Sequence, residues 1–313
     1  MNILLAAFRH KQLRLQFRAS PEHVVNIYER PGEFLAPAEL DRLVAQCRTV
    51  VRACLAGQDL DYGLFDPRTD AWSRCVITLV CRSADGAPVA FNAMPQLAVK
   101  RAGRDEHVLH LGLVMVDPSE RSGGLSWILY GLTCFALFLR GGLRPLWVSS
   151  VTQVPAVVGM VAETFSNVFP AQDATRQSFA HRHLAHQIMK RHRAAFGVGD
   201  DAGFDPDRQI ITDAYTGGSD NLKKSFDVAA KHRAERYNEY CLRELDYGRG
   251  DDVLQIGAID LGAGQRFLSR SVPRSALPQL AVQALVLATG AVVAPLIQWL
   301  DASTHSGRLR PAR

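Results

Sequence analysis

The amino-acid sequence predicts an α/β (α+β) fold, in which helices flank a mixed central sheet and a helical C-terminal extension follows. Short apolar segments that end at glycine or proline predict the strands. Segments with apolar residues at helical spacing lie between them and predict helices that cover the sheet. Beyond residue 172 the chain is more polar, and its charged segments predict further helices. The 313 residues are enough for one large domain or two modest ones.

The composition narrows the class of protein. With 47% hydrophobic and 21% charged residues, the chain resembles ordinary globular proteins, which excludes a disordered, collagen-like or coiled-coil protein. The net charge of +5 suits an anionic substrate, a carrier protein or a membrane surface, and we expect no nucleic-acid partner. None of the six cysteines lies in a CxxC pair or at zinc-ligand spacing. This predicts reduced thiols, no metal and a cytoplasmic protein.

The chain begins with a basic amphipathic segment, residues 1–22. Apolar residues there alternate with basic ones and no acidic residue occurs within 1–18, which predicts a short helix. Such a helix can lie on an anionic lipid surface or pack against its own domain, and both alternatives stay open. The basic side chains are those of Arg9, Lys11, Arg14 and Arg18.

Residues 23–172 are predicted to form the main domain. Strands are predicted at 23–28, 75–81, 89–93, 108–116 and 146–151. Helices are predicted from Pro37 to Cys54 and from Pro155 to Phe165. The segment 122–139 carries no charge over eighteen residues, long enough for a membrane span. Because it lies between two predicted strands, we expect a helix buried against the sheet instead.

Residues 173–262 are predicted to be a helical extension with helices at 175–196 and 220–245 and one added strand at 253–259. The first helix contains His181, His183, His186 and His192. No acidic or cysteine ligand lies within it, which favours a solvated basic face over a metal site. Residues 263–313 include an uncharged segment at 275–300 and a basic tail. That apolar helix can span a membrane, lie on its surface or pack against protein, including a second copy in a homodimer.

One segment indicates a binding site. Residues 114–126 read Val-Met-Val-Asp-Pro-Ser-Glu-Arg-Ser-Gly-Gly-Leu-Ser, which predicts a strand, a glycine turn and the start of a helix. Backbone N–H groups at such a helix start can bind an anion such as a pyrophosphate. Gly123 and Gly124 let the backbone approach this ligand, and Arg121 adds a charged contact. No phosphate-binding P-loop, HExxH or GxSxG motif occurs in the chain.

The pattern Val-x-Val-x-Pro followed by Arg-x-x-Gly-x-Ser resembles motif A of the GNAT superfamily of N-acetyltransferases, whose consensus is Arg/Gln-x-x-Gly-x-Gly/Ala. Ser126 takes the place of the usual final Gly or Ala. The predicted order of elements over 23–170 agrees with that superfamily. The resemblance implies a GNAT-like domain at 23–172 that binds acetyl-CoA or a longer acyl-CoA as co-substrate. The pyrophosphate would bind the backbone amides of Ser122, Gly123, Gly124, Leu125 and Ser126, and the pantetheine would run along the strand at Val114 and Val116.

The resemblance also implies that an amine acceptor attacks the thioester directly. Glu106 and His110 lie on or just before the motif strand, where bases for this step often lie, and Ser150 is one of the nearby hydroxyls. His110 can equally be a packed strand residue. The tyrosine acid that is frequent in the superfamily is absent from 155–165.

Two functions are therefore predicted. The first is an N-acyltransferase that uses acyl-CoA or an acyl-carrier protein. The alternative is a catalytically silent GNAT-fold binding or assembly protein associated with a membrane. In either case we expect a cytoplasmic protein, with peripheral attachment to the inner membrane through an anionic surface as an open alternative.

Overall fold

The computed structural model is built around one large sheet. The structure describes residues 12–60, 63–101, 103–121, 124–125, 127–171, 176–282 and 284–285. The main path of the sheet has the order β1-β2-β3-β4-β5-β7-β11-β10-β9; β6 pairs with β4 and β8 with β11. The pairing is antiparallel except between β5 and β7. The strands are β1 (Arg14–Arg18), β2 (His23–Glu29), β3 (Cys75–Arg82), β4 (Pro88–Arg101), β5 (Arg104–His110), β6 (Leu113–Val116), β7 (Leu146–Thr152), β8 (Ser166–Phe169), β9 (Gly203–Asp205), β10 (Ile210–Thr212) and β11 (Asp252–Ile259).

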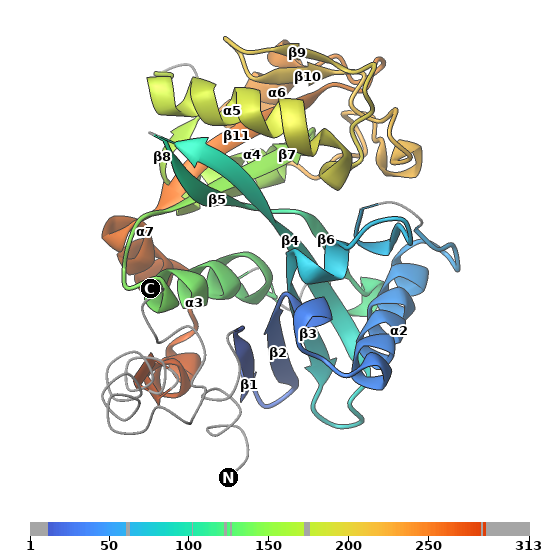
Figure 1. The fold of residues 1–313 in the computed structure, drawn as a ribbon, viewed down its shortest axis with the longest axis vertical. Coiled ribbons are helices and arrows are strands. Elements are labelled where there is room, and N and C mark those ends of the chain that lie inside the picture. The colour runs from blue at the N-terminus through green and yellow to red at the C-terminus, as the bar shows by residue number, and fades with distance from the viewer. Residues whose placement is uncertain are drawn as a thin grey trace.

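Helices cover both faces of this sheet (Figure 1). They are α2 (Pro37–Cys54), α3 (Thr133–Arg140), α4 (Pro155–Thr164), α5 (Phe179–His192), α6 (Glu235–Glu244) and α7 (Leu261–Arg266). A π-helical segment, Trp127–Leu132, leads directly into α3. The mixed α/β fold class predicted from the sequence is confirmed at this level.

The helices α2 and α5 pack on the same face of the sheet. α2 packs over Phe91 and Ala93 of β4, and α5 packs over Leu97 and Val99 of the same strand. Because side chains alternate along a strand, these four residues lie on one face. The segment 127–140 and α7 pack on the opposite face in a separate core cluster. Within the uncharged segment 122–139, residues 127–139 therefore form a helix packed against the sheet, as predicted. Of the helices within the described ranges, none is both long and apolar enough to cross a membrane.

The central strand is divided in two. The sequence predicts one strand over 108–116, but β5 ends at His110 and β6 begins at Leu113. Gly112 lies between them, and a Cβ there would collide with the carbonyl oxygen of Ala93. The chain bends where it crosses this close to β4, so β5 keeps its pairing with β7 whereas β6 turns away from it.

The N-terminal segment also differs from its prediction. Arg14–Arg18 is strand β1 rather than part of a basic helix, while residues 1–11 lie outside the described part of the chain. Leu15 and Phe17 are buried and the residues beside them are not, which is the two-residue period of a strand. Pairing with β2 fixes this period.

The extension beyond residue 172 contains more sheet than predicted. It adds β9, β10 and β11 to the sheet rather than one strand. Only Glu235–Glu244 of the predicted helix at 220–245 is a regular α-helix; residues 223–234 form an irregular segment. His181 is buried, and its side chain caps α5 together with Ser178, so it does not belong to a solvated face. The described part of 275–300 ends at Leu285, so the predicted apolar helix lies mostly outside it.

Candidate functional site

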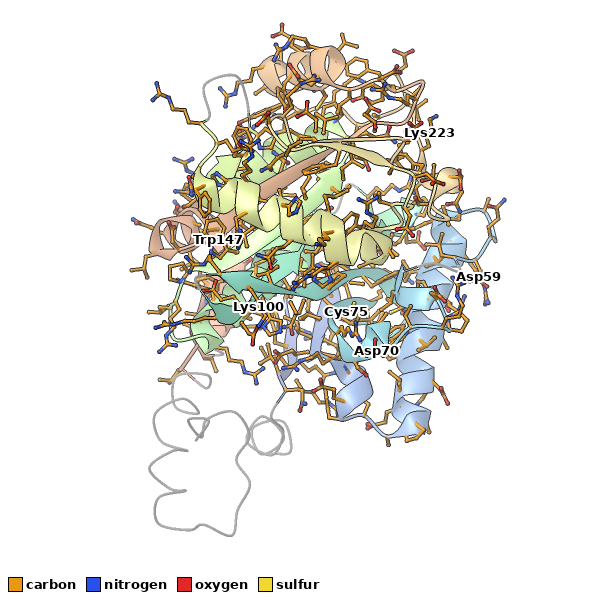
Figure 2. The ribbon with its side chains drawn as sticks, turned by 45° about the horizontal axis from the view of Figure 1, so that its top comes forward. Asp59, Asp70, Cys75, Lys100, Trp147 and Lys223 are labelled. Atoms are coloured by element: carbon orange, nitrogen blue, oxygen red, sulfur yellow. The ribbon has the colours of Figure 1, made fainter. Side chains whose placement is uncertain are left out.

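A cleft of about 750 Å³ opens where β6 and β7 separate. Val114 and Val116 line it on the β6 side, and Val151 and Thr152 line it on the β7 side. His110 lies at the point where the strands diverge. Cys75, which is labelled in Figure 2 and begins β3, also lines the cleft. The cleft is therefore created by the bend at Gly112.

The edge of β6 presents backbone groups to the cleft. Among the described strands, β6 pairs only with β4. The next residue, Asp117, donates its N–H to β4, whereas the carbonyl of Val116 accepts from Cys54 Sγ at 3.1 Å and from Arg121 Nε at 3.4 Å. Residues of an antiparallel strand alternate in the direction of their backbone groups. The N–H and C=O groups of Val114 therefore face the cleft as those of Val116 do.

The turn after β6 leads to a helix N-terminus. Leu125 is buried, and its carbonyl accepts hydrogen bonds from the N–H groups of Ile128 and Leu129. Gly124 is exposed with φ +65°, the left-handed region that favours glycine. Arg121 lines the cleft, and within the described chain it makes no ion pair with a carboxylate. The predicted residues Ser122, Gly123 and Ser126 lie outside the described residues.

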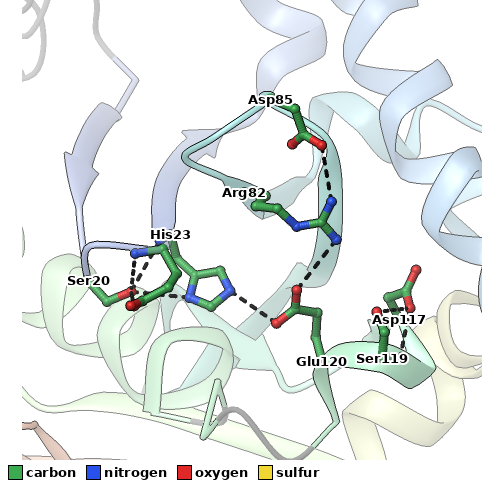
Figure 3. Close-up of polar contacts among 8 residues, drawn as sticks. Ser20, His23, Arg82, Asp85, Asp117, Ser119 and Glu120 are labelled. Carbon is green, nitrogen blue, oxygen red and sulfur yellow. Dashed lines mark hydrogen bonds and ion pairs between the residues drawn. The ribbon is translucent and has the colours of Figure 1, made fainter.

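A polar network holds this turn in place (Figure 3). Asp117 Oδ1 accepts from the backbone N–H of Ser119 at 2.9 Å and from its hydroxyl at 2.7 Å, and these bonds lower the pKa of the Asp117 carboxyl. Glu120 lies 3.3 Å from His23 Nε2 and 3.6 Å from Arg82. The turn after β6 is thus connected to both strands of the β2–β3 pair.

His110 reaches the cleft as a neutral ring. Its Nδ1 lies 3.0 Å from the Ser149 hydroxyl, and the ring stacks on Phe196 with centroids 4.9 Å apart. Burial, aided by the nearby His192, lowers the pKa of His110 to about 3. A group with that pKa is a weak base at neutral pH.

The other two predicted catalytic residues lie outside the cleft lining. Glu106 lies near the far end of β5, where its carboxylate accepts from Arg101 Nε at 2.8 Å. Ser150 is buried on β7, and its side chain points to the opposite face from Ser149 because neighbouring strand residues alternate. The structure thus brings together His110, Val114, Val116 and Arg121, but not Glu106 or Ser150.

Sequence reasoning missed an acidic residue in the cleft. Asp252, at the start of β11, lines the cleft and is 5% exposed. Its Oδ1 accepts from the Tyr215 hydroxyl at 3.0 Å, and burial raises the pKa of Asp252 to about 7. In the sequence, the pair Asp251-Asp252 precedes an apolar strand, which is a signal for an acid at a strand end. Which of these two carboxyl groups lines the cleft depends on how β11 pairs with β7, and this pairing is visible only in the structure.

The cleft combines three chemical features: the edge of β6 that faces away from β4, the exposed side chain of Arg121, and the buried carboxyl group of Asp252. Such a site can bind an extended molecule with amide groups and an anionic end. Among the described residues, those of the cleft included, no three His, Cys, Asp or Glu side chains gather in a way that could hold a metal ion. No protein-family model matches the chain, and no curated protein matches it.

Proposed function

We propose that this chain is an N-acyltransferase that transfers an acyl group from acyl-CoA, or from an acyl-carrier protein, to an amine. One observation carries the proposal: the free edge of β6 leads into the turn at Arg121 and the helix that follows Leu125. The domain would be the GNAT-like one expected at 23–172, with a C-terminal extension of helices and strands.

The donor matches this edge in shape and chemistry. Pantetheine is an extended chain with two amide groups, which can pair with a strand as an added strand does. The backbone N–H and C=O of Val114 and the N–H of Val116 would be its partners, whereas the carbonyl of Val116 already accepts from Cys54 Sγ and Arg121 Nε. The pyrophosphate would then reach the helix N-terminus, where free N–H groups and the helix dipole favour an anion, and Arg121 would add a charged hydrogen bond.

The reaction follows from this placement. A neutral amine attacks the thioester carbonyl, the carbonyl oxygen becomes an oxyanion, and the thiolate of the donor leaves. A backbone N–H at the bend between β5 and β6 can stabilise the oxyanion. No covalent bond to the protein is required.

A binding protein without catalysis is the second candidate. It is favoured by the separation of the three predicted catalytic residues, since Glu106 and Ser150 do not line the cleft and His110 is a weak base. Donor binding is common to both candidates, and acyl transfer distinguishes them.

We also propose that the protein attaches peripherally to an anionic membrane surface. An apolar groove of about 490 Å³ lies between α3 and α7 and includes Leu143, Leu261 and Leu277, all of which are exposed. Residues 261–300 contain no acidic side chain, and the exposed Arg270 and Arg274 lie in sequence between the lining residues Ser269 and Leu277. Exposed apolar residues flanked by arginines match the charge and chemistry of an anionic lipid surface.

Calorimetric titration of the full chain with acetyl-CoA, octanoyl-CoA and palmitoyl-CoA tests the donor site. We expect saturable binding, and a thermal midpoint that rises with ligand concentration because only the folded state binds. Release of free CoA in the presence of an amine would then establish transfer. If the folded protein binds none of these thioesters, the proposed function is wrong.

A further inference from the structure

The carboxyl group of Asp252 lies on the same face of the sheet as His110. Leu254 of β11 pairs with Val151 of β7, and both belong to the core beneath α5. Asp252 is two residues before Leu254 and so lies on that face as well. His110 lies there with Phe196, which follows α5. This part of the cleft is separate from the helix N-terminus, which packs on the opposite face.

Among the described residues, Asp252 has a neutral partner and makes no ion pair with a cation. Tyr215 donates to Oδ1, and Oδ2 makes no hydrogen bond within the described chain. The charged and titratable neighbours have other partners: Asp251 is paired with Arg249 at 2.7 Å, Lys223 donates to the Gly248 carbonyl at 2.6 Å, and Tyr247 donates to the Gln153 carbonyl at 2.7 Å. Lys224 lines the cleft but makes no ion pair with Asp252. A buried carboxyl group in this state either holds a proton or binds a cation from outside.

The cleft that contains Asp252 is lined in part by apolar and aromatic residues. Phe196, Val151 and Val228 line the same cleft, as does the ring of Tyr215. Aromatic faces attract cations, and apolar walls favour an apolar body behind the charged group. A carboxylate on the ligand would be repelled by Asp252.

We propose that this part of the cleft binds the acceptor, a primary amine carried on an apolar body, and that Asp252 receives the proton of its ammonium group. The inference rests on the proposed acyltransferase function and names the substrate class and the base for it. Tyr215 is a positioning residue, because it holds one carboxylate oxygen and leaves the other for the amine.

The proton and electron balance is complete. The ammonium gives one proton to Asp252, and the nitrogen lone pair forms the N–C bond to the thioester carbonyl. The C–S bond breaks, and its electron pair leaves with sulfur. A second proton from nitrogen reaches the thiolate, and Asp252 returns its proton to water. The products are an amide, a free thiol and one released proton.

The test compares Asp252→Asn with the unchanged protein, using acetyl-CoA as donor and phenethylamine, hexylamine and phenylalanine as acceptors. Thiol release at pH 7.5 gives kcat/KM. We expect about 10²- to 10⁴-fold loss with both amines in the variant, and unchanged acetyl-CoA affinity by calorimetry. In the unchanged protein, phenylalanine should be at least about tenfold poorer than phenethylamine because its carboxylate meets Asp252, a difference typical of one misplaced charge.

Two further variants make the outcome decisive. Asp220→Asn removes an exposed acid whose neighbours Ser219 and Asn221 line the cleft but which does not line it itself, and it should change nothing. Tyr215→Phe removes the hydrogen bond that lowers the pKa of Asp252, so the acidic limb of the kcat/KM profile should move to higher pH. Full activity in a folded Asp252→Asn variant would refute the acceptor site while leaving the donor site intact. Failure of acetyl-CoA to bind the unchanged protein would refute the acyltransferase proposal itself.

Discussion

The backbone N–H of Leu111, just after β5, donates to the carbonyl of Ser149 on β7 at 2.6 Å. In the described chain this is the last backbone hydrogen bond to β7 before the chain turns away into β6. Beyond it the chain bends at Gly112 and β6 keeps only β4 as a partner. An inner strand of a sheet normally has both edges paired, so an edge left open inside the molecule is available to a ligand. The predictions below test this edge, the turn after it and the surfaces around it.

Gly124→Val should abolish acyl-CoA binding, with at least about a hundredfold loss of affinity, as two lost charged hydrogen bonds would produce. Gly124 has φ +65°, which a β-branched residue avoids, so the turn must change shape. The space around Gly124 is open, so the core should stay intact. Calorimetry measures the affinity, and circular dichroism checks folding. Gly86→Val, at another left-handed glycine in an exposed turn, is the control and should bind normally. An unchanged affinity in folded Gly124→Val would contradict the assigned pyrophosphate site.

Arg121→Ala should weaken donor binding by about 1–3 kcal/mol, the usual contribution of one charged hydrogen bond. The effect should shrink as salt is added, because Arg121 is exposed. Arg74→Ala is a suitable control, since that side chain is also exposed and pairs with Asp70 outside the cleft lining. Equal affinities for the two variants would remove Arg121 from the donor site.

Replacing Asp252 should change how stability depends on pH. Its pKa is about 7 in the folded chain against an ordinary value of 3.8, so the folded state binds the proton more tightly than the unfolded state. Its contribution to stability is complete below pH 3.8 and is lost as the pH rises to about 7. Each pH unit in this window corresponds to about 1.4 kcal/mol, so the total loss is of order 4 kcal/mol.

Asp252→Asn cannot ionise and should not show this loss. Denaturant unfolding of both proteins at pH 4.5, 6 and 7.5 gives the difference in the free energy of unfolding. As the pH rises, the variant should become more stable relative to the unchanged protein. Other titrating groups, such as His110, contribute equally to both proteins and cancel in this difference. A pH-independent difference would show that Asp252 has an ordinary pKa in the folded chain.

His110→Gln separates a structural histidine from a catalytic base. The ring contacts Ser149 and Phe196 and is neutral above about pH 3, so its loss should reduce stability by about 1–3 kcal/mol, as for a buried polar group that loses its partner. The acidic limb of the kcat/KM profile near pH 7 should remain. Disappearance of that limb in the variant, with retained binding of acetyl-CoA, would instead assign the base to His110.

Leu261→Asp should weaken sedimentation with anionic liposomes. Leu261 is 66% exposed beside the apolar groove, and burial of apolar area contributes about 25 cal/mol per Å² at a lipid surface. Leu242→Asp provides a matched control, because Leu242 is 58% exposed on α6 and does not line the groove. We expect the unchanged protein and Leu242→Asp to bind equally. If the unchanged protein stays in solution at both low and high salt, the membrane surface is wrongly assigned.

Local patterns in the sequence determine much of the fold. The strands β2, β3 and β7 and the helices α2 and α4 lie where apolar periodicity, proline and glycine predict them, because their signals lie within the elements themselves. Near Arg121, β6 and the helical segment from Trp127 lie within the predicted strand and the predicted helix, so local residue order alone indicates where to look for a donor site. The thiols are unpaired, as predicted, since all six cysteines are free.

The tertiary structure decided what long-range pairing controls. Arg14–Arg18 becomes a strand because β2 offers an edge, and the strand predicted over 108–116 divides because Gly112 crosses close to Ala93. His110 and Asp252 have displaced pKa values because distant segments bury them. The sequence by itself determined the elements whose signals are local, such as β2, β3, α2 and α4. Only the packed sheet decided that Asp252, rather than Glu106 or Ser150, shares the cleft with His110, because burial and strand register depend on residues far apart in the chain.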